Sequence, residues 1–159
     1  MILYHGSNVE VKEPRLLKNQ RELDFGKGFY TTTDLKQATS WAIRTAARLR
    51  QANAFVSVYE LDDEKMQKLN ILTFSQPDND WLRFVVANRK GINICSEWDL
   101  IRGPVADDQT AQVIDLFLDG MYDEEYAVKK LLPQRLNDQY TFKTDKAIQL
   151  LITKEVIKL

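Results

Sequence analysis

Two short segments near the start of the chain hold the residues best suited to chemistry. Residues 4–7 are Tyr-His-Gly-Ser and include His5, the only histidine. Residues 25–30 are Phe-Gly-Lys-Gly-Phe-Tyr, a glycine loop that ends at Tyr30. An imidazole can hydrogen-bond a ribose hydroxyl, glycines let the backbone approach a ligand closely, and a tyrosine ring offers a flat face for stacking. Each feature alone also has a purely structural explanation, as packing of His5 and as a turn at the glycines.

In combination, the two segments resemble the first two motifs of the ADP-ribosyltransferase (ART) superfamily, in its diphtheria-toxin and poly(ADP-ribose) polymerase branch. Residues 101–108 (Ile-Arg-Gly-Pro-Val-Ala-Asp-Asp) and 139–144 (Gln-Tyr-Thr-Phe-Lys-Thr) also resemble an uncharacterised bacterial ART-like domain family, so the resemblance spans most of the chain. It implies an α+β fold in which two short mixed or antiparallel sheets, with flanking helices, form a cleft for NAD.

The resemblance also implies roles for individual residues. His5 would bind a hydroxyl of the adenosine ribose, the Gly6 backbone would contact the nicotinamide carboxamide, and Tyr30 would stack on the nicotinamide ring. Trp41 lies near the position of a second aromatic wall, with helix packing as the equal alternative. The expected contacts of NAD, as substrate, are therefore His5, Gly6, Ser7, Gly26, Gly28, Tyr30 and Trp41.

Gln139 occupies the place where the superfamily has a catalytic glutamate at the start of a late strand. In relatives that glutamate contacts the 2′-hydroxyl of the nicotinamide ribose, where positive charge develops in the transition state. Glutamine keeps the hydrogen-bonding capacity but lacks the charge, and the missing charge would cost about 2–4 kcal/mol of transition-state stabilisation. The resemblance thus implies a catalytic set of His5, Tyr30 and Gln139.

Several charged residues are candidates for supplementing this set. Glu22, Asp24, Asp107, Asp108 and Asp138 are the acids that could replace the missing charge. For residues 107–108 the structural alternative is a helix N-cap, and for Asp138 it is a turn. The loop cations Lys18, Arg21 and Lys27 are candidates for contacting the pyrophosphate.

The function implied is an NAD-dependent mono-ADP-ribosyltransferase, a glycosyltransferase of the pentosyl class, which passes ADP-ribose to a macromolecule or to water. A protein acceptor is favoured over nucleic acid. The family context implies a toxin–antitoxin setting, with a neutralising partner protein. The alternative is an NAD- or ADP-ribose-binding pseudoenzyme or interaction module without turnover, and a third interpretation is a purely structural domain.

Other chemistries find little support. One histidine and one cysteine do not make a zinc site, and the Gly26-x-Gly28 spacing lacks the third glycine of a dinucleotide fingerprint. Cys95 is expected to be a small buried hydrophobe. Trp81 and Phe84, three positions apart, are expected to belong to the core.

The site residues must be positioned by short, interleaved elements. β-branched and aromatic residues predict strands at 2–4, 55–61, 70–74, 98–105 and 139–144, and a C-terminal strand within 150–159. Apolar periodicity predicts helices at 34–51, 79–89, 108–119, 123–132 and 145–151, with Thr33 as the first N-cap. The polar residues 8–29 predict a long loop, which in a compact domain is usually functional or mobile.

Composition sets the remaining limits. The 159 residues suit one α+β domain over 1–159, and the net charge of −1 argues against a general basic surface for nucleic acid. No apolar run approaches the roughly 20 residues that span a bilayer. The single cysteine favours a reducing cytoplasm, and the start of the chain, which lacks a signal-peptide pattern, is expected to belong to a mature protein.

Overall fold

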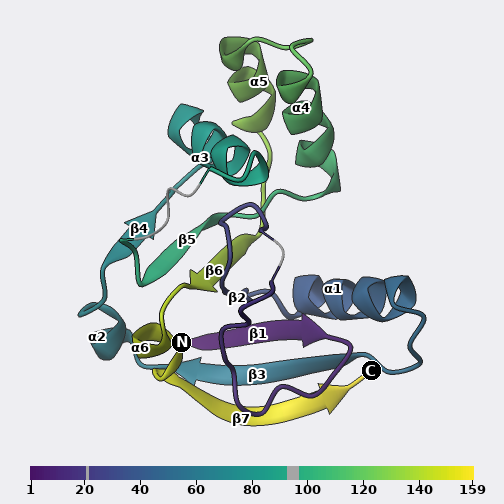
Figure 1. Ribbon diagram of the computed structural model, residues 1–159, viewed down its shortest axis with the longest axis vertical. Coiled ribbons are helices and arrows are strands. Elements are labelled where there is room, and N and C mark those ends of the chain that lie inside the picture. The colour runs from purple at the N-terminus through teal and green to yellow at the C-terminus, as the bar shows by residue number, and fades with distance from the viewer. Residues whose placement is uncertain (21, 93–96) are drawn as a thin grey trace.

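The computed structural model describes residues 1–20, 22–92 and 97–159, so the predictions for Arg21 and Cys95 lie outside the described residues. Over these residues the chain forms an α+β structure with two separate sheets (Figure 1). One sheet has the strand order β1-β3-β7 and the other has the order β2-β6-β5-β4. The predicted fold class is therefore confirmed at the level of α+β with two short sheets.

The first sheet is antiparallel and carries helix α1 on one face (Figure 1). It contains β1 (Ile2–Ser7), β3 (Phe55–Leu61) and β7 (Leu151–Lys158). Helix α1 (Leu35–Arg48) packs the buried alanines Ala38, Ala42 and Ala46 against this sheet. Small side chains on the helix allow its backbone to lie close to β1, the strand that contains Gly6.

The second sheet is mixed. It contains β2 (Phe29–Thr31), β6 (Asp138–Phe142), β5 (Leu100–Pro104) and β4 (Ile71–Thr73). Only β4 and β5 run parallel to each other. The two sheets meet where Tyr4 and Thr32 exchange backbone hydrogen bonds of 2.8 and 3.0 Å. This junction brings the middle of β1 beside the end of β2.

Three helices form a layer beyond the second sheet, at the top of Figure 1. They are α3 (Asn79–Arg89), α4 (Asp108–Leu118) and α5 (Glu124–Leu131). Trp81 is fully buried and donates its indole N–H to the Pro104 carbonyl at 2.9 Å. Phe84, which is 9% exposed, belongs to the same core cluster, so both residues are core residues as predicted.

Two one-turn helices lie near the start of β1 and complete the fold (Figure 1). Helix α2 (Asp63–Met66) was absent from the sequence prediction, because four residues are too few to show a period. Helix α6 (Asp145–Ile148) begins at the N-cap Thr144, which the sequence analysis had placed in the preceding strand. Met66 and Ile148 belong to one buried cluster with Leu3 and Phe142, which fills the space between the two sheets.

The start of α1 differs from the prediction. Asp34, not Thr33, is the N-cap, and its carboxylate accepts from the amides of Lys36 and Gln37 at 2.7 and 3.0 Å. Leu35 and Leu49, near the two ends of this segment, are 42% and 50% exposed, so the buried face of α1 consists of alanines. The helix ends earlier than position 51 because Leu49 is its C-cap and Arg50 has a positive φ of 53°.

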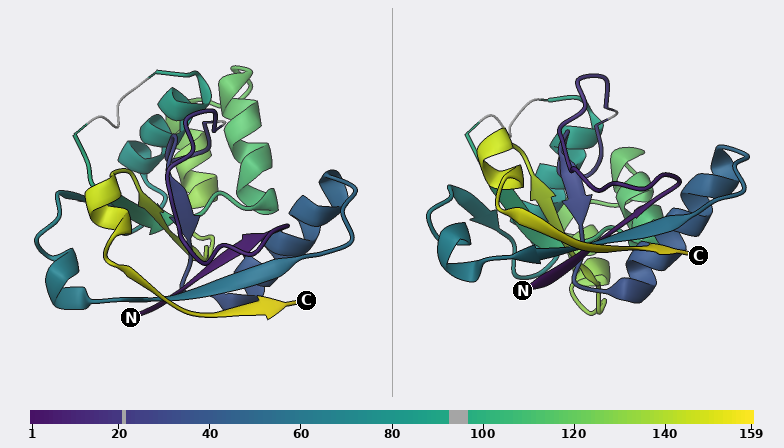
Figure 2. Two further views of the ribbon diagram at one scale, coloured as in Figure 1. Left: turned by 60° about the horizontal axis from the view of Figure 1, so that its bottom comes forward. Right: turned by 90° about the horizontal axis from the view of Figure 1, so that it is seen from below.

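Residues 8–28 form the long connection that the sequence predicted, and it is attached to the body at several points. The Tyr59 hydroxyl donates to the Val11 carbonyl at 2.6 Å, and the Val11 amide donates to Ser57 at 3.2 Å. Burial raises the pKa of Tyr59 to about 12, because an ionised phenolate would lose hydration at this position. In Figure 2 the segment runs from the end of β1 toward the helical layer.

Candidate functional site

His5 and Tyr30 come together where the two sheets meet. Nδ1 of His5 lies 2.7 Å from the Tyr30 carbonyl oxygen, and the imidazole stacks on Phe29 with ring centroids 4.4 Å apart. A carbonyl can only accept, so Nδ1 carries the proton. Desolvation lowers the pKa of His5, with the Tyr30 hydrogen bond opposing it, so the ring is neutral near pH 7. Nε2 is then a hydrogen-bond acceptor on a residue that lines a cleft.

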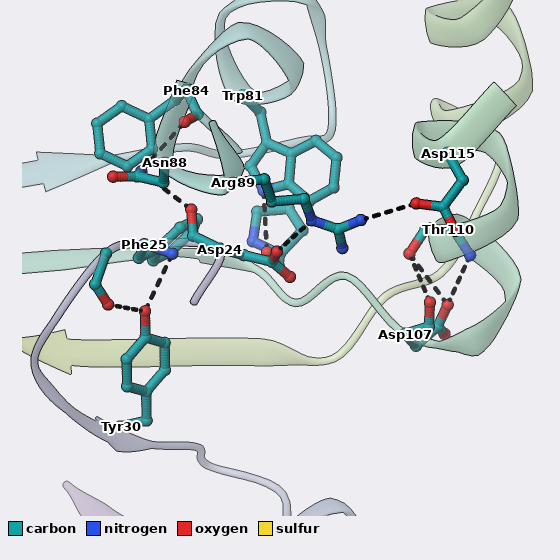
Figure 3. A network of polar contacts seen from close by, with 12 residues as sticks. Asp24, Phe25, Tyr30, Trp81, Phe84, Asn88, Arg89, Asp107, Thr110 and Asp115 are labelled. Carbon is teal, nitrogen blue, oxygen red and sulfur yellow. Dashed lines mark hydrogen bonds and ion pairs between the residues drawn. The ribbon is translucent and has the colours of Figure 1, made fainter. Parts of the chain in front are cut away.

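The Tyr30 hydroxyl is already engaged by the glycine loop. It donates to the Gly26 carbonyl at 2.5 Å and accepts from the Phe25 amide at 3.0 Å (Figure 3). Tyr30 also lines the cleft and pairs with Thr141 across β2 and β6. The phenol therefore serves to orient the side chain, and the ring is the part of Tyr30 suited to a ligand.

Two glycines of these segments, Gly6 and Gly28, lie so close to neighbouring elements that a side chain would not fit, which the sequence did not reveal. A Cβ on Gly6 would lie 2.0 Å from the Ala38 carbonyl oxygen of α1, and one on Gly28 would lie 2.6 Å from the Thr141 side chain. Both backbone polar groups of Gly28 bond to the Gln20 side chain, at 2.6 and 3.1 Å. Gly28 therefore approaches β6 closely, and the role predicted for it in ligand binding stays a prediction.

The remaining glycine of the loop needs its conformational freedom. Gly26 has a φ of +74°, and its amide donates to Leu23 in a tight turn. Gly6, Ser7 and Gly28 line the cleft, whereas Gly26 is not among its lining residues. Gly26 therefore contributes to the site by holding Tyr30 through its carbonyl.

Gln139 lies on β6, opposite Gly103 of β5, and lines the same cleft as His5 and Tyr30. The residue is largely buried, with 5% of its surface exposed. The amide nitrogen Nε2 is buried and has no hydrogen-bond partner. An unsatisfied buried amide costs about 1–3 kcal/mol, so a ligand oxygen that accepted from Nε2 would recover that cost.

The cleft that joins these three residues is wide, with a volume of about 1800 Å³. That volume exceeds the roughly 300–1,000 Å³ of typical small-molecule pockets. Its walls come from β1, the long connection, β2, α1 and the segment after β5. Such a space can accept a molecule as long as a dinucleotide, together with part of a second reactant.

Trp41 lines this cleft from α1 and is 43% exposed, so its ring is not part of the core. The Arg44 guanidinium lies 5.9 Å from the centre of that ring. Arg44 also forms an ion pair of 3.1 Å with Asp108, whose side chain is 91% exposed. An ion pair this exposed is weak, so Arg44 is available to an anionic ligand.

Most of the acids predicted to replace the missing glutamate charge form hydrogen bonds or ion pairs with other residues. Asp107 accepts from the Thr110 amide at 3.0 Å and so caps α4, as the structural alternative predicted. Asp138 accepts from Thr33 at 2.9 and 2.6 Å and from Thr32 at 3.0 Å, which joins β6 to the entrance of α1. Asp24 is paired with Arg89 at 2.7 Å, and Glu22 remains as an acid of the loop that lines the cleft.

The cations of the cleft differ from those that the sequence suggested. Lys18 and Lys27 are exposed and are not among its lining residues. The lining residues include the cations Lys12, Arg15, Arg44 and Arg89. Arg44 reaches the cleft from α1, and its position there depends on how that helix packs, which no local sequence pattern reveals.

The described part of the chain shows neither a cluster of metal-ligating side chains nor a membrane-spanning helix. Among its residues, no group of three or more His, Cys, Asp or Glu side chains could hold a metal ion. No helix there has the length and apolar character needed to cross a bilayer.

Asn88 and Arg89, at the end of α3, hold the loop that carries the Tyr30 contacts, and neither was predicted from the sequence as a site residue. The one available signal was an asparagine on the apolar side of an amphipathic helix, where a buried amide needs partners.

Comparison with known proteins gives one match. No curated protein and no solved structure matches the chain. A family model described as "Protein of unknown function (DUF3990)" matches residues 1–152, which is nearly the whole chain, and its description names no activity. The chain therefore belongs to the DUF3990 family.

Proposed function

We propose that this protein has an ART-like fold and is an NAD-dependent mono-ADP-ribosyltransferase. The observation that carries the proposal is the buried, unpartnered Nε2 of Gln139 in a cleft that His5 and Tyr30 also line. Three residues distant in sequence meet in one cleft, and they are those for which the ART resemblance implies a role. An amide nitrogen without a partner can donate to a ligand that is rich in oxygen acceptors, such as the ribose of NAD.

Each residue has a role that suits its surroundings. His5, with its proton on Nδ1, accepts a hydrogen bond at Nε2 from a hydroxyl of the adenosine ribose. The Tyr30 ring, fixed by two hydrogen bonds, stacks on the nicotinamide. Trp41 offers a second aromatic surface, and Gln139 donates from Nε2 to the 2′-hydroxyl oxygen of the nicotinamide ribose.

The reaction breaks the bond between C1′ of that ribose and the nicotinamide nitrogen, and nicotinamide leaves with the electron pair. A nucleophile of the acceptor bonds to C1′ and loses its proton to solvent or to a nearby base. Gln139 positions the sugar but supplies no negative charge, so we expect slow turnover. The acceptor is a macromolecule, with protein favoured over nucleic acid, and the proposed setting is a cytoplasmic toxin with a neutralising partner.

A binding module without turnover is the second candidate, and the neutrality of Gln139 favours it. Asp24, Asp107 and Asp138, the nearby acids that could compensate, are held by other partners. A protein of this kind would bind NAD or ADP-ribose in the same cleft and release no nicotinamide.

Nicotinamide release distinguishes the two candidates. Purified protein would be incubated with NAD, and free nicotinamide would be measured for wild type, His5→Ala, Gln139→Ala and the exposed control Gln112→Ala. We expect release by wild type and by the control, with a loss of at least about tenfold in the two site variants. NAD binding without release by the wild type would favour the binding module, and equal release by all four proteins would contradict the assigned site.

A further inference from the structure

A polar network links the end of α3 to the Tyr30 hydroxyl (Figure 3). Asn88 is 3% exposed, and its Nδ2 donates to the carbonyl oxygens of Asp24 and Phe84, both at 3.1 Å. Arg89 donates through Nε to the Asp24 carboxylate at 2.7 Å and pairs with Asp115 of α4 at 3.3 Å. Two consecutive residues of α3 therefore hold both the backbone and the side chain of Asp24.

The residue after Asp24 extends the attachment into the core. The Phe25 ring is fully buried and meets Phe84 edge-on, with ring centroids 5.8 Å apart. The Phe25 carbonyl accepts from Lys143, beyond the end of β6, at 2.7 Å. Residues 24–26, which we call the loop turn, are thus bound to α3 on one side and to the second sheet on the other.

The loop turn in turn holds Tyr30. The Phe25 amide donates to the Tyr30 hydroxyl, and that hydroxyl donates to the Gly26 carbonyl. The hydroxyl oxygen lies on the axis about which the ring turns, so holding this oxygen fixes χ1 and with it the direction in which the Tyr30 side chain points. Any change that loosens the loop turn releases the ring as well.

The ion pair between Arg89 and Asp24 is better placed to stabilise the loop turn than the other ion pairs of the helical layer. The side chains of Arg89 and Asp24 are only 25% and 19% exposed. In the pair between Arg83 and Glu124, on the same helix, the arginine side chain is 64% exposed. Exposed pairs contribute little, so Arg83 provides a matched control for Arg89.

We propose that Asn88 and Arg89 are positioning residues, which clamp the loop turn to α3 and thereby hold the Tyr30 ring at the cleft. Helix α3 then supports the candidate site, although His5, Tyr30 and Gln139 all lie on strands outside the helical layer. The effect of the clamp on NAD rests on the proposed function, but the effect on the loop turn and on Tyr30 does not.

Amide hydrogen exchange tests the clamp without any ligand. Exchange at the Phe25 amide would be followed by NMR in wild type, Arg89→Gln, Asn88→Ala and the control Arg83→Gln, with the Val56 amide of β3 as an internal reference for global stability. We expect at least tenfold faster exchange at Phe25 in Arg89→Gln and Asn88→Ala, with Val56 changed much less. An unchanged Phe25 rate, or a rise equal to that at Val56, would overturn the proposal.

A double-mutant cycle tests the link to Tyr30. Tyr30→Phe removes the hydroxyl but keeps the ring, so the NAD dissociation constant of Tyr30→Phe, Arg89→Gln and the double variant reports their coupling. We expect each single variant to weaken binding by several fold and the double variant to be little worse than either. Effects that multiply would overturn the coupling. A wild type that fails to bind NAD would overturn the proposed function alone, and the exchange rates would still decide whether the clamp exists.

Discussion

At the scale of single residues, Gln139 places a buried polar group in the wall of the cleft. It combines 5% exposure with an amide nitrogen that has no partner. The same position would hold a carboxylate in a catalytically stronger relative, by the resemblance noted above. A glutamate at position 139 would show whether the missing negative charge limits the rate of nicotinamide release.

We expect Gln139→Glu to accelerate nicotinamide release by about 30- to 1,000-fold, because the charge would supply about 2–4 kcal/mol to the transition state. Initial rates with saturating NAD would be compared with those of wild type and of Gln112→Glu, a surface control. A rate for Gln139→Glu that matches both comparison proteins would contradict the catalytic placement of residue 139.

His5 predicts a dependence of stability on pH. Burial lowers its pKa in the folded protein below the ordinary 6.5. Below pH 6.5 the unfolded chain therefore takes up a proton at His5 before the folded chain does, and stability falls as the pH decreases from 6.5 to the lowered pKa. Above 6.5 the group contributes no pH dependence.

Urea unfolding of wild type and His5→Gln between pH 5 and 8 would measure this contribution. The free energy of unfolding of the wild type should fall relative to that of the variant as the pH decreases below 6.5. A constant difference between the two proteins across the range would show that His5 titrates alike in both states.

At the scale of elements, the approach of α1 to β1 depends on one glycine. Gly6→Ala would place a Cβ 2.0 Å from the Ala38 carbonyl and 2.9 Å from the Ala42 amide nitrogen. Both contacts are with helix backbone, so the helix must move, at a cost of about 1–3 kcal/mol in the free energy of unfolding. Chemical denaturation would measure this loss. Ser40→Ala, at an exposed site on α1, should change stability by less than about 0.5 kcal/mol, and an equally small effect at Gly6 would contradict the packing described.

The entrance of α1 depends on Asp138 of β6. Its carboxylate accepts three hydrogen bonds from Thr32 and Thr33, which connect β2 to the helix. Asp138→Ala removes all three acceptors, and we expect a loss of about 2–3 kcal/mol in the free energy of unfolding. Asp119→Ala, at an exposed position just after α4, serves as the control in thermal or urea unfolding. Similar stabilities for the two variants would show that the Asp138 contacts contribute nothing.

At the scale of the whole molecule, the elements with strong local signals were predictable. The helix at 79–89 and the strand at 55–61 match α3 and β3 residue for residue, because their periodicity and β-branched content are unambiguous. Helix α2 is too short to show a period, and the N-cap of α1 moved by one residue because Asp138, distant in sequence, engages Thr33.

At the candidate site, the sequence predicted which central residues come together, but it did not predict their contacts. His5, Tyr30 and Gln139 line one cleft, as expected of a common site. The partners of Gly6, Gly28 and Asp24 lie on α1, on β6 and on α3, and no local pattern encodes such tertiary contacts. Lys18 and Lys27 do not line the cleft, whereas Arg44 and Arg89 do, and this difference likewise depends on tertiary packing.

The proposed function requires that the cleft bind NAD through His5, and calorimetric titration would measure this binding without depending on turnover. NAD would be titrated into wild type and into His5→Ala, after circular dichroism has shown that the variant is folded. The account predicts saturable binding by wild type and binding at least about tenfold weaker in the variant, from the loss of one hydrogen bond in a desolvated site. A folded wild type that shows no heat of binding with millimolar NAD, or a variant that binds as tightly as wild type, would contradict it.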